Sequence, residues 1–263
     1  MTRKLAACLA LGLALGPPAL AASYYYEATT TESGGKSDAP VLTRMRAWVD
    51  GPRAKIEVIE GPKSGLPVGS YLVTRDGGET VSFVNPKKKA YAKWELDATL
   101  RDVADRLNGE GLVKLELSDV TDQPLLDEPG EPLLGHATIH KRWKSGYSIK
   151  YGALGMARQR RDETVKDVWV TDAIAVAGFD ALLSPRQVQT GNALLDKALI
   201  AKLGNVKGFT LKSASVTTTK DDKGKEETRR SSTVVTQLRE EASPAARFEI
   251  PATYTERPFK KVR

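Results

Sequence analysis

The side chains best suited to chemistry at neutral pH are few in this chain. His136 and His140, in the stretch HATIH, are its only histidines, and on a strand their even spacing places both on one face. Residues four apart on a strand are separated by about 13 Å, which is too far to share one metal ion. We therefore expect two surface or half-buried strand histidines, with no metal site and no cofactor.

Nucleophiles and acid–base pairs show no more organisation. The one cysteine, Cys8, lies in an N-terminal leader, so neither thiol nor disulfide chemistry is expected in the rest of the chain. The serines lack a G-x-S-x-G motif, and no phosphate-binding glycine loop follows a strand. Acidic residues stand mostly beside Lys or Arg, as in DDKGKEE, which is typical of solvated surfaces. The sequence predicts no catalytic residue and no enzyme.

The leader has the pattern of an export signal. Two basic residues at positions 3–4 precede an apolar run over residues 5–15, and Ala-Leu-Ala at 19–21 supplies the small residues of a cleavage site. We expect residues 1–22 to be a signal peptide and the mature protein to be periplasmic or secreted. The alternative is a lipoprotein processing box ending at Cys8; against it, the apolar run follows the cysteine. No later stretch approaches the roughly 20 apolar residues of a transmembrane helix.

The positive charge favours a surface role over nucleic-acid binding. The formal net charge is +7, and it is carried in short clusters at 87–89, 158–161 and 260–261 that flank predicted strands. Nucleic-acid binding would call for aromatic side chains between the basic ones or for a basic helical stripe, so no such partner is expected. Anionic headgroups or an acidic partner fit better, and a solvated, edge-protecting surface is the simplest interpretation.

Period-two alternation is the main signal from residue 23 onward. In RMRAWVDGPRAKIEV, Met45 and Val49 fall on one face of a strand while Arg44 and Arg46 fall on the other. The Asp-Gly pair at 50–51 supplies a turn between two such runs. The stretch predicts a half-buried antiparallel hairpin whose Met45 and Val49 face the interior.

Other segments alternate in the same way. They are YYYEATTTE, SYLVTR, ETVSFVN and AYAKWEL, then GLVKLELSDV, HATIHKRW with GYSIKYG, ARQRRDE and VKDVWVTD, with turns between them. FTLKSASVTTT and RSSTVVTQLREE predict a long hairpin with a charged tip. Near the end, FEIPATY predicts a segment that closes the sheet, with Phe248 and Ile250 packed inward.

Two helices complete the prediction, and the first of them is amphipathic. Asp97 fits an N-terminal cap, and Leu100, Val103 and Leu107 follow it on one helical face. The second helix is predicted over about 192–203, between an asparagine cap and a glycine. Helices this short need tertiary contacts to stay formed, so we expect both to lie against the sheet.

A large antiparallel sheet with two helices must cover its apolar face, and curling is one way to do so. We predict a mainly β (α+β) fold: a large curved antiparallel sheet that forms an unclosed half-barrel, with a few helices packed on its concave side. No linker or internal repeat divides the chain, so residues 23–263 are expected to form one domain.

The order of elements resembles that of a known superfamily. RMRAWVDGPRAKIEV, the meander YLVTRDGGETVSFVNPKKKAYAKWEL, GEPLLGHATIHKRW, VKDVWVTDAIA and FEIPATY together look like the LolA/LolB-like superfamily of periplasmic lipoprotein carriers. The resemblance covers nearly the whole mature chain. It is closest to the bacterial family named domain of unknown function 4412.

The resemblance implies an unclosed barrel whose hydrophobic cavity accepts acyl chains or another apolar ligand, with helices as a lid. In the carrier branch a strand arginine helps to hold the lid closed. Arg44 and Arg46 are the nearest candidates for such a lid or headgroup contact here. The charged hairpin at 216–234 and the insertion at 130–135 depart from a minimal carrier.

The four tryptophans divide between the two faces of the predicted sheet. By strand alternation, Trp48 and Trp169 fall on the same face as polar neighbours, whereas Trp94 and Trp143 fall on the same face as apolar ones. All four could be ordinary packing residues, or some could line a ligand cavity. The candidate cavity residues are Met45, Val49, Trp94, Leu100, Val103, Leu107 and Trp143.

Two functions remain as hypotheses. The first is an exported periplasmic binding or carrier-like protein whose half-barrel holds an apolar ligand, such as a lipid or the acyl chains of a lipoprotein. The alternative is a non-enzymatic envelope sensor or protein-interaction module with the same fold, which contacts an envelope protein partner through the charged tip at 220–227.

Overall fold

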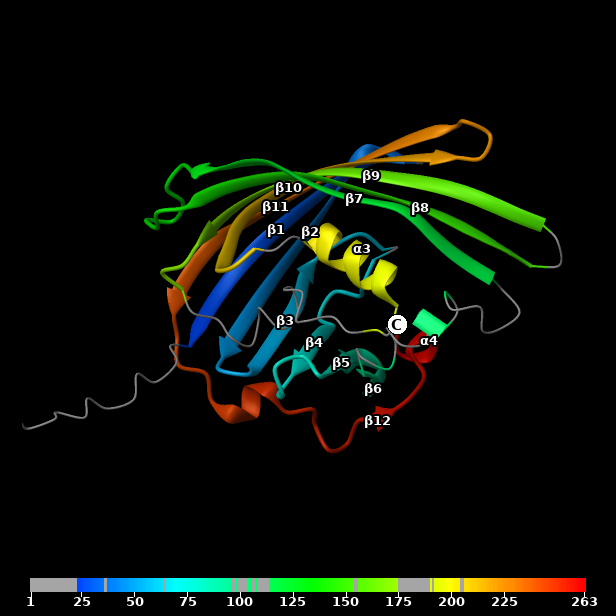
Figure 1. Cartoon of the computed structure of the whole chain (residues 1–263). Coiled ribbons are helices and arrows are strands. Elements are labelled where there is room, and N and C mark those ends of the chain that lie inside the picture. The colour runs from blue at the N-terminus through cyan, green and yellow to red at the C-terminus, as the bar shows by residue number, and fades with distance from the viewer. Residues whose placement is uncertain are drawn as a thin grey trace, which may run out of the picture.

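The computed structural model describes residues 23–35, 37–63, 65–95, 98, 104–105, 107, 114–153, 156–174, 190, 192–203 and 206–263. Their strands form one twelve-stranded sheet in the order β12-β6-β5-β4-β3-β2-β1-β11-β10-β9-β8-β7. The sheet curves into an open arch whose end strands do not pair with each other, and helix α3 lies on its concave side (Figure 1). The predicted unclosed half-barrel is confirmed.

All strand pairs are antiparallel except that of β12 with β6. The strands are β1 (Tyr24–Gly34), β2 (Ser37–Asp50), β3 (Arg53–Glu60), β4 (Tyr71–Thr74), β5 (Thr80–Asn85), β6 (Ala90–Glu95), β7 (Lys114–Pro129), β8 (Ile139–Ala153), β9 (Met156–Thr171), β10 (Phe209–Asp221), β11 (Glu226–Glu240) and β12 (Thr255–Glu256). The helical elements are η1 (Pro86–Lys88), α3 (Ala193–Leu203), η2 (Ala245–Phe248) and α4 (Phe259–Val262).

The predicted hairpin at the start of the chain is confirmed as β2 and β3. Asp50 and Arg53 face each other across the turn and form an ion pair. Gly51 has a φ of 55°, and a Cβ at this position would meet nothing within 4 Å. Glycine is therefore favoured by the left-handed backbone conformation and not by a lack of space.

The turns predicted within HATIHKRW–GYSIKYG and between ARQRRDE and VKDVWVTD are wrong. Each region is one continuous strand, β8 and β9, and the two pair along almost their full length. Gly146 lies inside β8, where a Cβ would be 3.0 Å from Thr121 Oγ1 of β7. Here glycine allows a close approach between strands, and pairing on both sides outweighs the local turn signal.

The second predicted helix is confirmed as α3, and Asn192 caps it as expected, since its Oδ1 accepts a hydrogen bond of 3.0 Å from Leu195 N. The first predicted helix is described only in part. Ala98, Ala104, Asp105 and Leu107 are helical. Asp97, Leu100 and Val103 lie outside the described residues.

The concave face carries an apolar row that crosses seven strands, β6, β5, β4, β3, β2, β1 and β11. Successive cross-strand partners in this row are Ala92, Phe83, Leu72, Ile56, Ala47, Tyr26 and Leu238. Because side chains of partnered residues point to the same face of a sheet, the whole row faces the inside of the arch. The predicted inward orientation of Met45 and Val49, which alternate with Ala47, follows from the same register.

Residues 241–263, which we call the C-terminal strap, wrap around one end of the sheet. The strap first crosses the convex face, where Phe248 packs against Tyr25, Trp48 and Tyr71. It then pairs with β6 through β12 and ends on the concave face, where Val262 packs against Phe83. FEIPATY covers the convex face and does not close the sheet as expected, but Phe248 is buried as predicted.

One carboxylate ties the beginning of the strap to the sheet. Glu241 accepts hydrogen bonds from Arg247 (2.8 Å), Arg239 (2.6 Å) and Trp48 Nε1 (3.3 Å). The hydrogen bonds from Arg247 and Arg239 lower the pKa of Glu241 from its usual 4.5. The stabilisation is therefore complete above pH 4.5 and is lost as the pH falls toward the lowered value.

We expect Glu241→Gln to reduce the free energy of unfolding by about 0.5–1 kcal/mol at neutral pH. The gap between wild type and variant should shrink as the pH falls from about 6 to 3, because protonation removes the charge from the wild-type side chain as well. Urea denaturation at several pH values measures the gap. A gap that stays constant over this range would rule out the ionised carboxylate as its source.

Candidate functional site

The concave face of the arch is where the candidate cavity residues of β2 lie. Val49 is buried in a cluster with Tyr26, Phe209 and Leu211, whereas Met45 is half-buried. The cluster joins β1, β2, β3, β10 and β11, so its residues come from both ends of the chain. It provides a continuous apolar floor at the centre of the arch.

Trp94 lies on the same face, beside the end of the C-terminal strap. Its ring centroid is 4.6 Å from that of Phe259 in α4, and Phe259 in turn lies 5.2 Å from Phe83. Asn85 Nδ2 donates a hydrogen bond of 2.8 Å to the Val262 carbonyl oxygen, which fixes the end of α4. The chain's own aromatic side chains therefore pack against Trp94.

Trp143 anchors α3 to the other end of the arch. Its Nε1 donates a hydrogen bond of 3.1 Å to the carbonyl oxygen of Ala201, and both groups are buried. Trp143 also packs with Val168 and Val170 of β9, and Lys166 Nζ lies 5.3 Å from its ring centroid. Trp143 is thus a contact between helix and sheet.

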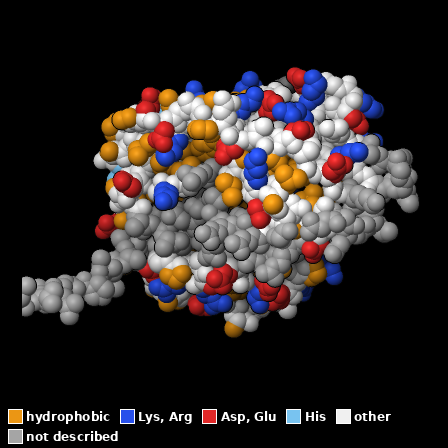
Figure 2. Space-filling model, in the orientation of Figure 1, with side chains coloured by type: hydrophobic (Ala, Val, Ile, Leu, Met, Phe, Trp, Pro, Cys, Tyr) orange, Lys and Arg blue, Asp and Glu red, His pale blue; other side chains and the backbone are white. Residues whose placement is uncertain are grey.

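Helix α3 leaves large apolar side chains exposed both along the face that packs against the sheet and to one side of it. Ala198 and Ala201 are buried, but Leu194 is 47% exposed and Ile200 is 40% exposed. Figure 2 shows exposed apolar side chains at the position that α3 occupies in Figure 1. Leu194 lies one turn before Ala198 on the same helical face, and Ile200 lies about 120° around the helix from Leu194. Apolar side chains of a surface helix are normally covered, so the exposure of these two calls for an explanation.

The remaining predicted site residues are not gathered in one place. Leu107 is half-buried, while Leu100 and Val103 lie outside the described residues. Arg44 and Arg46 point from the convex face, where Arg44 pairs with Glu27 and Glu60 and Arg46 pairs with Glu57. The structure therefore separates both arginines from the concave residues by the thickness of the sheet.

A polar network on the concave face was not foreseen from the sequence. The buried carboxylate of Asp162 accepts hydrogen bonds from Tyr147 (2.9 Å), Arg160 (2.8 Å) and Thr219 (2.8 Å). Burial, and then the hydrogen bond to Asp162, raise the pKa of Tyr147. The threonine run at 217–219 of β10, of which Thr217 and Thr219 share the face of Asp162, could have indicated this patch. The concave face is thus apolar at its centre and polar toward the free ends of β8, β9 and β10.

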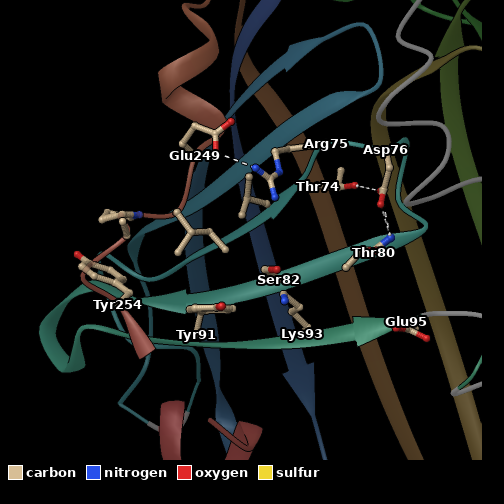
Figure 3. A pocket seen from close by; sticks show the side chains of 14 residues that line it. Thr74, Arg75, Asp76, Thr80, Ser82, Tyr91, Lys93, Glu95, Glu249 and Tyr254 are labelled. Atoms are coloured by element: carbon tan, nitrogen blue, oxygen red, sulfur yellow. Dashed lines mark hydrogen bonds and ion pairs between the residues drawn. The ribbon is translucent and has the colours of Figure 1, made fainter. Parts of the chain in front are cut away.

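A cavity of about 490 Å³ lies on the convex face, between the C-terminal strap and strands β4, β5 and β6. Figure 3 shows Arg75 and Glu249 on one side of it and Ser82, Tyr91 and Lys93 on the other. The sequence offered no signal for this cavity, because residues 73–95 and 249–254 are far apart in the chain and no motif joins them.

The two histidines do not meet in a shared site. His140 stacks on Trp169 with ring centroids 4.2 Å apart, and its Nε2 lies 2.7 Å from Asp167 Oδ1. His136 forms a backbone bridge with Leu133. Among the described residues, no group of three or more His, Cys, Asp or Glu side chains is arranged to hold a metal ion. No helix in the described part of the chain is long and apolar enough to cross a membrane.

The charged tip at 220–227 is a compact turn at the end of β10 and β11. Asp221 Oδ1 accepts hydrogen bonds from the backbone N–H groups of Lys223 (2.9 Å) and Lys225 (2.8 Å). The side chains of residues 222–226 are exposed. The tip therefore presents both signs of charge to solvent, with Asp222 and Glu226 beside the lysines.

Comparison with known proteins adds two distant structural likenesses. No family model and no curated protein matches the chain. An outer membrane lipoprotein-sorting protein domain from Vibrio parahaemolyticus is similar over 88% of this chain and 91% of its own, with 8% identity and a TM-score of 0.31. A DUF1329 family protein from Desulfovibrio piger is similar over 92% of both chains, with 8% identity and a TM-score of 0.24. Both TM-scores are below 0.5, which is too low for these likenesses to support a functional conclusion.

Proposed function

We propose that the protein is a periplasmic, non-enzymatic binding or carrier-like protein that holds an acyl chain or a similar apolar ligand between its concave face and α3. The observation that carries the proposal is the exposure of two large apolar side chains of α3, Leu194 and Ile200. An apolar ligand packed against this helix would remove both from water. Burial of apolar area stabilises a complex by about 25 cal/mol per Å².

The concave face supports this proposal in two ways. Its centre is an apolar floor to which Val49 and Tyr26 contribute, and Met45 beside them is half-buried. Toward the ends of β8, β9 and β10 the same face becomes polar around Asp162 and Tyr147. A surface that changes from apolar to polar suits a molecule with a chain and a polar head. We also propose that the leader at 1–22 exports the protein, and that the protein is related to the domain of unknown function 4412 family.

The test is a titration of the purified protein with cis-parinaric acid, a fluorescent fatty acid, followed by probe and tryptophan emission. We expect saturable uptake by the wild type. The double variant Leu194→Asp/Ile200→Asp should bind at least about tenfold more weakly, which corresponds to about 1.4 kcal/mol, because two carboxylates would then have to be desolvated against the ligand.

The matched control is Leu42→Asp/Val216→Asp. These two residues are exposed to a similar degree, 42% and 40%, but they lie on the convex face of β2 and β10. The control should bind the probe as the wild type does. Absence of uptake by the wild type, or equal loss in both double variants, would contradict the proposal and turn attention to a protein partner for the charged tip at 220–227.

A further inference from the structure

The cavity on the convex face has the size and position of a small-molecule site, and the concave-face function does not use it. Its volume of about 490 Å³ falls within the range of about 300–1,000 Å³ that is usual for ligand pockets. One wall is the rigid sheet, represented by Val73 and Ser82, and the other is the strap, represented by Ile250 and Tyr254. The cavity is therefore built by the fold and is not a gap between loose loops.

The cations of the lining are already neutralised by carboxylates. Arg75 pairs with Glu249 at 2.7 Å, and Lys93 pairs with Glu256 at 2.8 Å. Both pairs join the sheet to the strap. The hydrogen bond and charge of Glu256 raise the pKa of Lys93, so the lysine is protonated at neutral pH. An anionic ligand would have to displace a carboxylate from one of these cations, which disfavours phosphates and acids.

Asp76 is also committed to local partners. Its Oδ1 accepts hydrogen bonds from Thr74 Oγ1 (2.8 Å) and Thr80 N (3.0 Å). Partial burial raises the pKa of Asp76, but the hydrogen bonds from Thr80 and Thr74 outweigh it and lower the pKa overall. A cationic ligand would therefore compete with these donors. What the lining offers is a set of polar side chains that already have partners within the protein and still carry further N–H donors and oxygen acceptors.

Aromatic rings complete the lining. Tyr91 on β6 and Tyr254 on the strap are half-buried, and both pack against the cluster that contains Tyr71 and Phe248. Figure 3 shows both tyrosines beside the cavity, opposite Asp76 and Thr80. The face of a tyrosine ring is electron-rich and attracts the C–H groups of a ligand, while hydroxyl groups of a ligand can donate and accept at the same time.

We propose that this cavity binds a neutral sugar unit, such as one or two rings of a glycan. The C–H face of a pyranose packs on Tyr254, and its hydroxyl groups bridge the donors and acceptors of the Arg75–Glu249 pair and of Lys93. The site is independent of the concave face and of any apolar ligand held there.

The test uses maltose, cellobiose, sucrose and N,N′-diacetylchitobiose as probes, each titrated to 20 mM against the isotope-labelled protein and followed by amide NMR shifts. We expect saturable shifts in residues 73–95 and 249–256 with at least one of these neutral disaccharides, and weaker binding of glucose 1-phosphate. The proposal fails if none of the four gives saturable shifts there, or if glucose 1-phosphate binds more tightly than all of them.

Variants distinguish the cavity from the surrounding surface. Ala252→Trp adds a ring at an exposed residue of the lining and should weaken disaccharide binding at least tenfold, whereas Ala245→Trp, exposed but outside the lining, should not. Tyr254→Phe should retain binding, and Tyr254→Ala should lose it. Ala252→Trp should leave cis-parinaric acid uptake unchanged. The proposal for the convex cavity can therefore fail while the proposal for the concave face holds, and the reverse. Equal disaccharide binding by Ala252→Trp and Ala245→Trp would place the sugar elsewhere and overturn the assignment.

Discussion

Replacing Phe248 with alanine is expected to lower the free energy of unfolding by about 3–5 kcal/mol, the usual cost of removing a buried aromatic side chain. Phe248 is 0% exposed, and the guanidinium carbon of Arg53 lies 5.3 Å from its ring centroid. Trp48 and Tyr71 of the sheet contact the same cluster. The sheet side of this cluster is rigid, so the space left by the ring cannot close fully and the cost stays near the upper end.

Urea denaturation at neutral pH, followed by tryptophan emission, measures this loss. Leu42→Ala removes an apolar side chain that is exposed on the same convex face, and it should change the free energy of unfolding by less than about 0.5 kcal/mol. If Phe248→Ala also costs less than about 1 kcal/mol, the C-terminal strap does not unfold together with the sheet. That outcome would remove the strap as a stable wall of the convex cavity.

Replacing Trp143 with alanine is the second change with a large expected effect. Trp143 is 6% exposed and joins α3 to β8 and β9, so its loss should also cost about 3–5 kcal/mol. The effect should be concentrated in α3, because the hydrogen bond from Trp143 Nε1 to Ala201 is lost together with the packing against Val168 and Val170. Amide hydrogen exchange in residues 193–203 should therefore accelerate more than exchange in β1 and β2.

Trp143→Phe separates the hydrogen bond from the packing. It keeps an aromatic ring but leaves the carbonyl oxygen of Ala201 without this donor, which costs about 1–3 kcal/mol. The matched control is Trp169→Phe, on the convex face of β9, where the ring stacks on His140. This control variant should leave amide hydrogen exchange in α3 unchanged. If both tryptophan variants accelerate α3 exchange equally, Trp143 is not the anchor of this helix.

The sequence by itself determined the local part of the structure. Side-chain alternation along a strand follows from the two-residue repeat of the backbone, so it correctly placed Met45 and Val49 on the face opposite Arg44 and Arg46. The helix over residues 193–203 followed from its asparagine cap and the glycine after it for the same reason, since both signals depend on residues close together in the chain. That the sheet curls and closes only in part followed from the number of strands and the small number of helices.

Tertiary structure decided which strands continue and which faces are covered. The Ser145–Gly146 pair resembles a turn, yet pairing with β7 and β9 keeps β8 extended through it. Phe248 is buried as expected, but whether an apolar residue packs on one face of a sheet or the other depends on where distant segments lie. Trp48, on the more polar face, is buried for that reason beneath the strap.

The candidate sites depend most strongly on long-range contacts. The two walls of the convex cavity are separated by more than half of the chain, and their ion pairs, Arg75–Glu249 and Lys93–Glu256, exist only after the strap has crossed the sheet. The network around Asp162 likewise needs the register of β8, β9 and β10. Alternation is a property of each strand. Strand register, and the choice of which sheet face is covered, depend on packing among distant segments, so they cannot be predicted from any one segment.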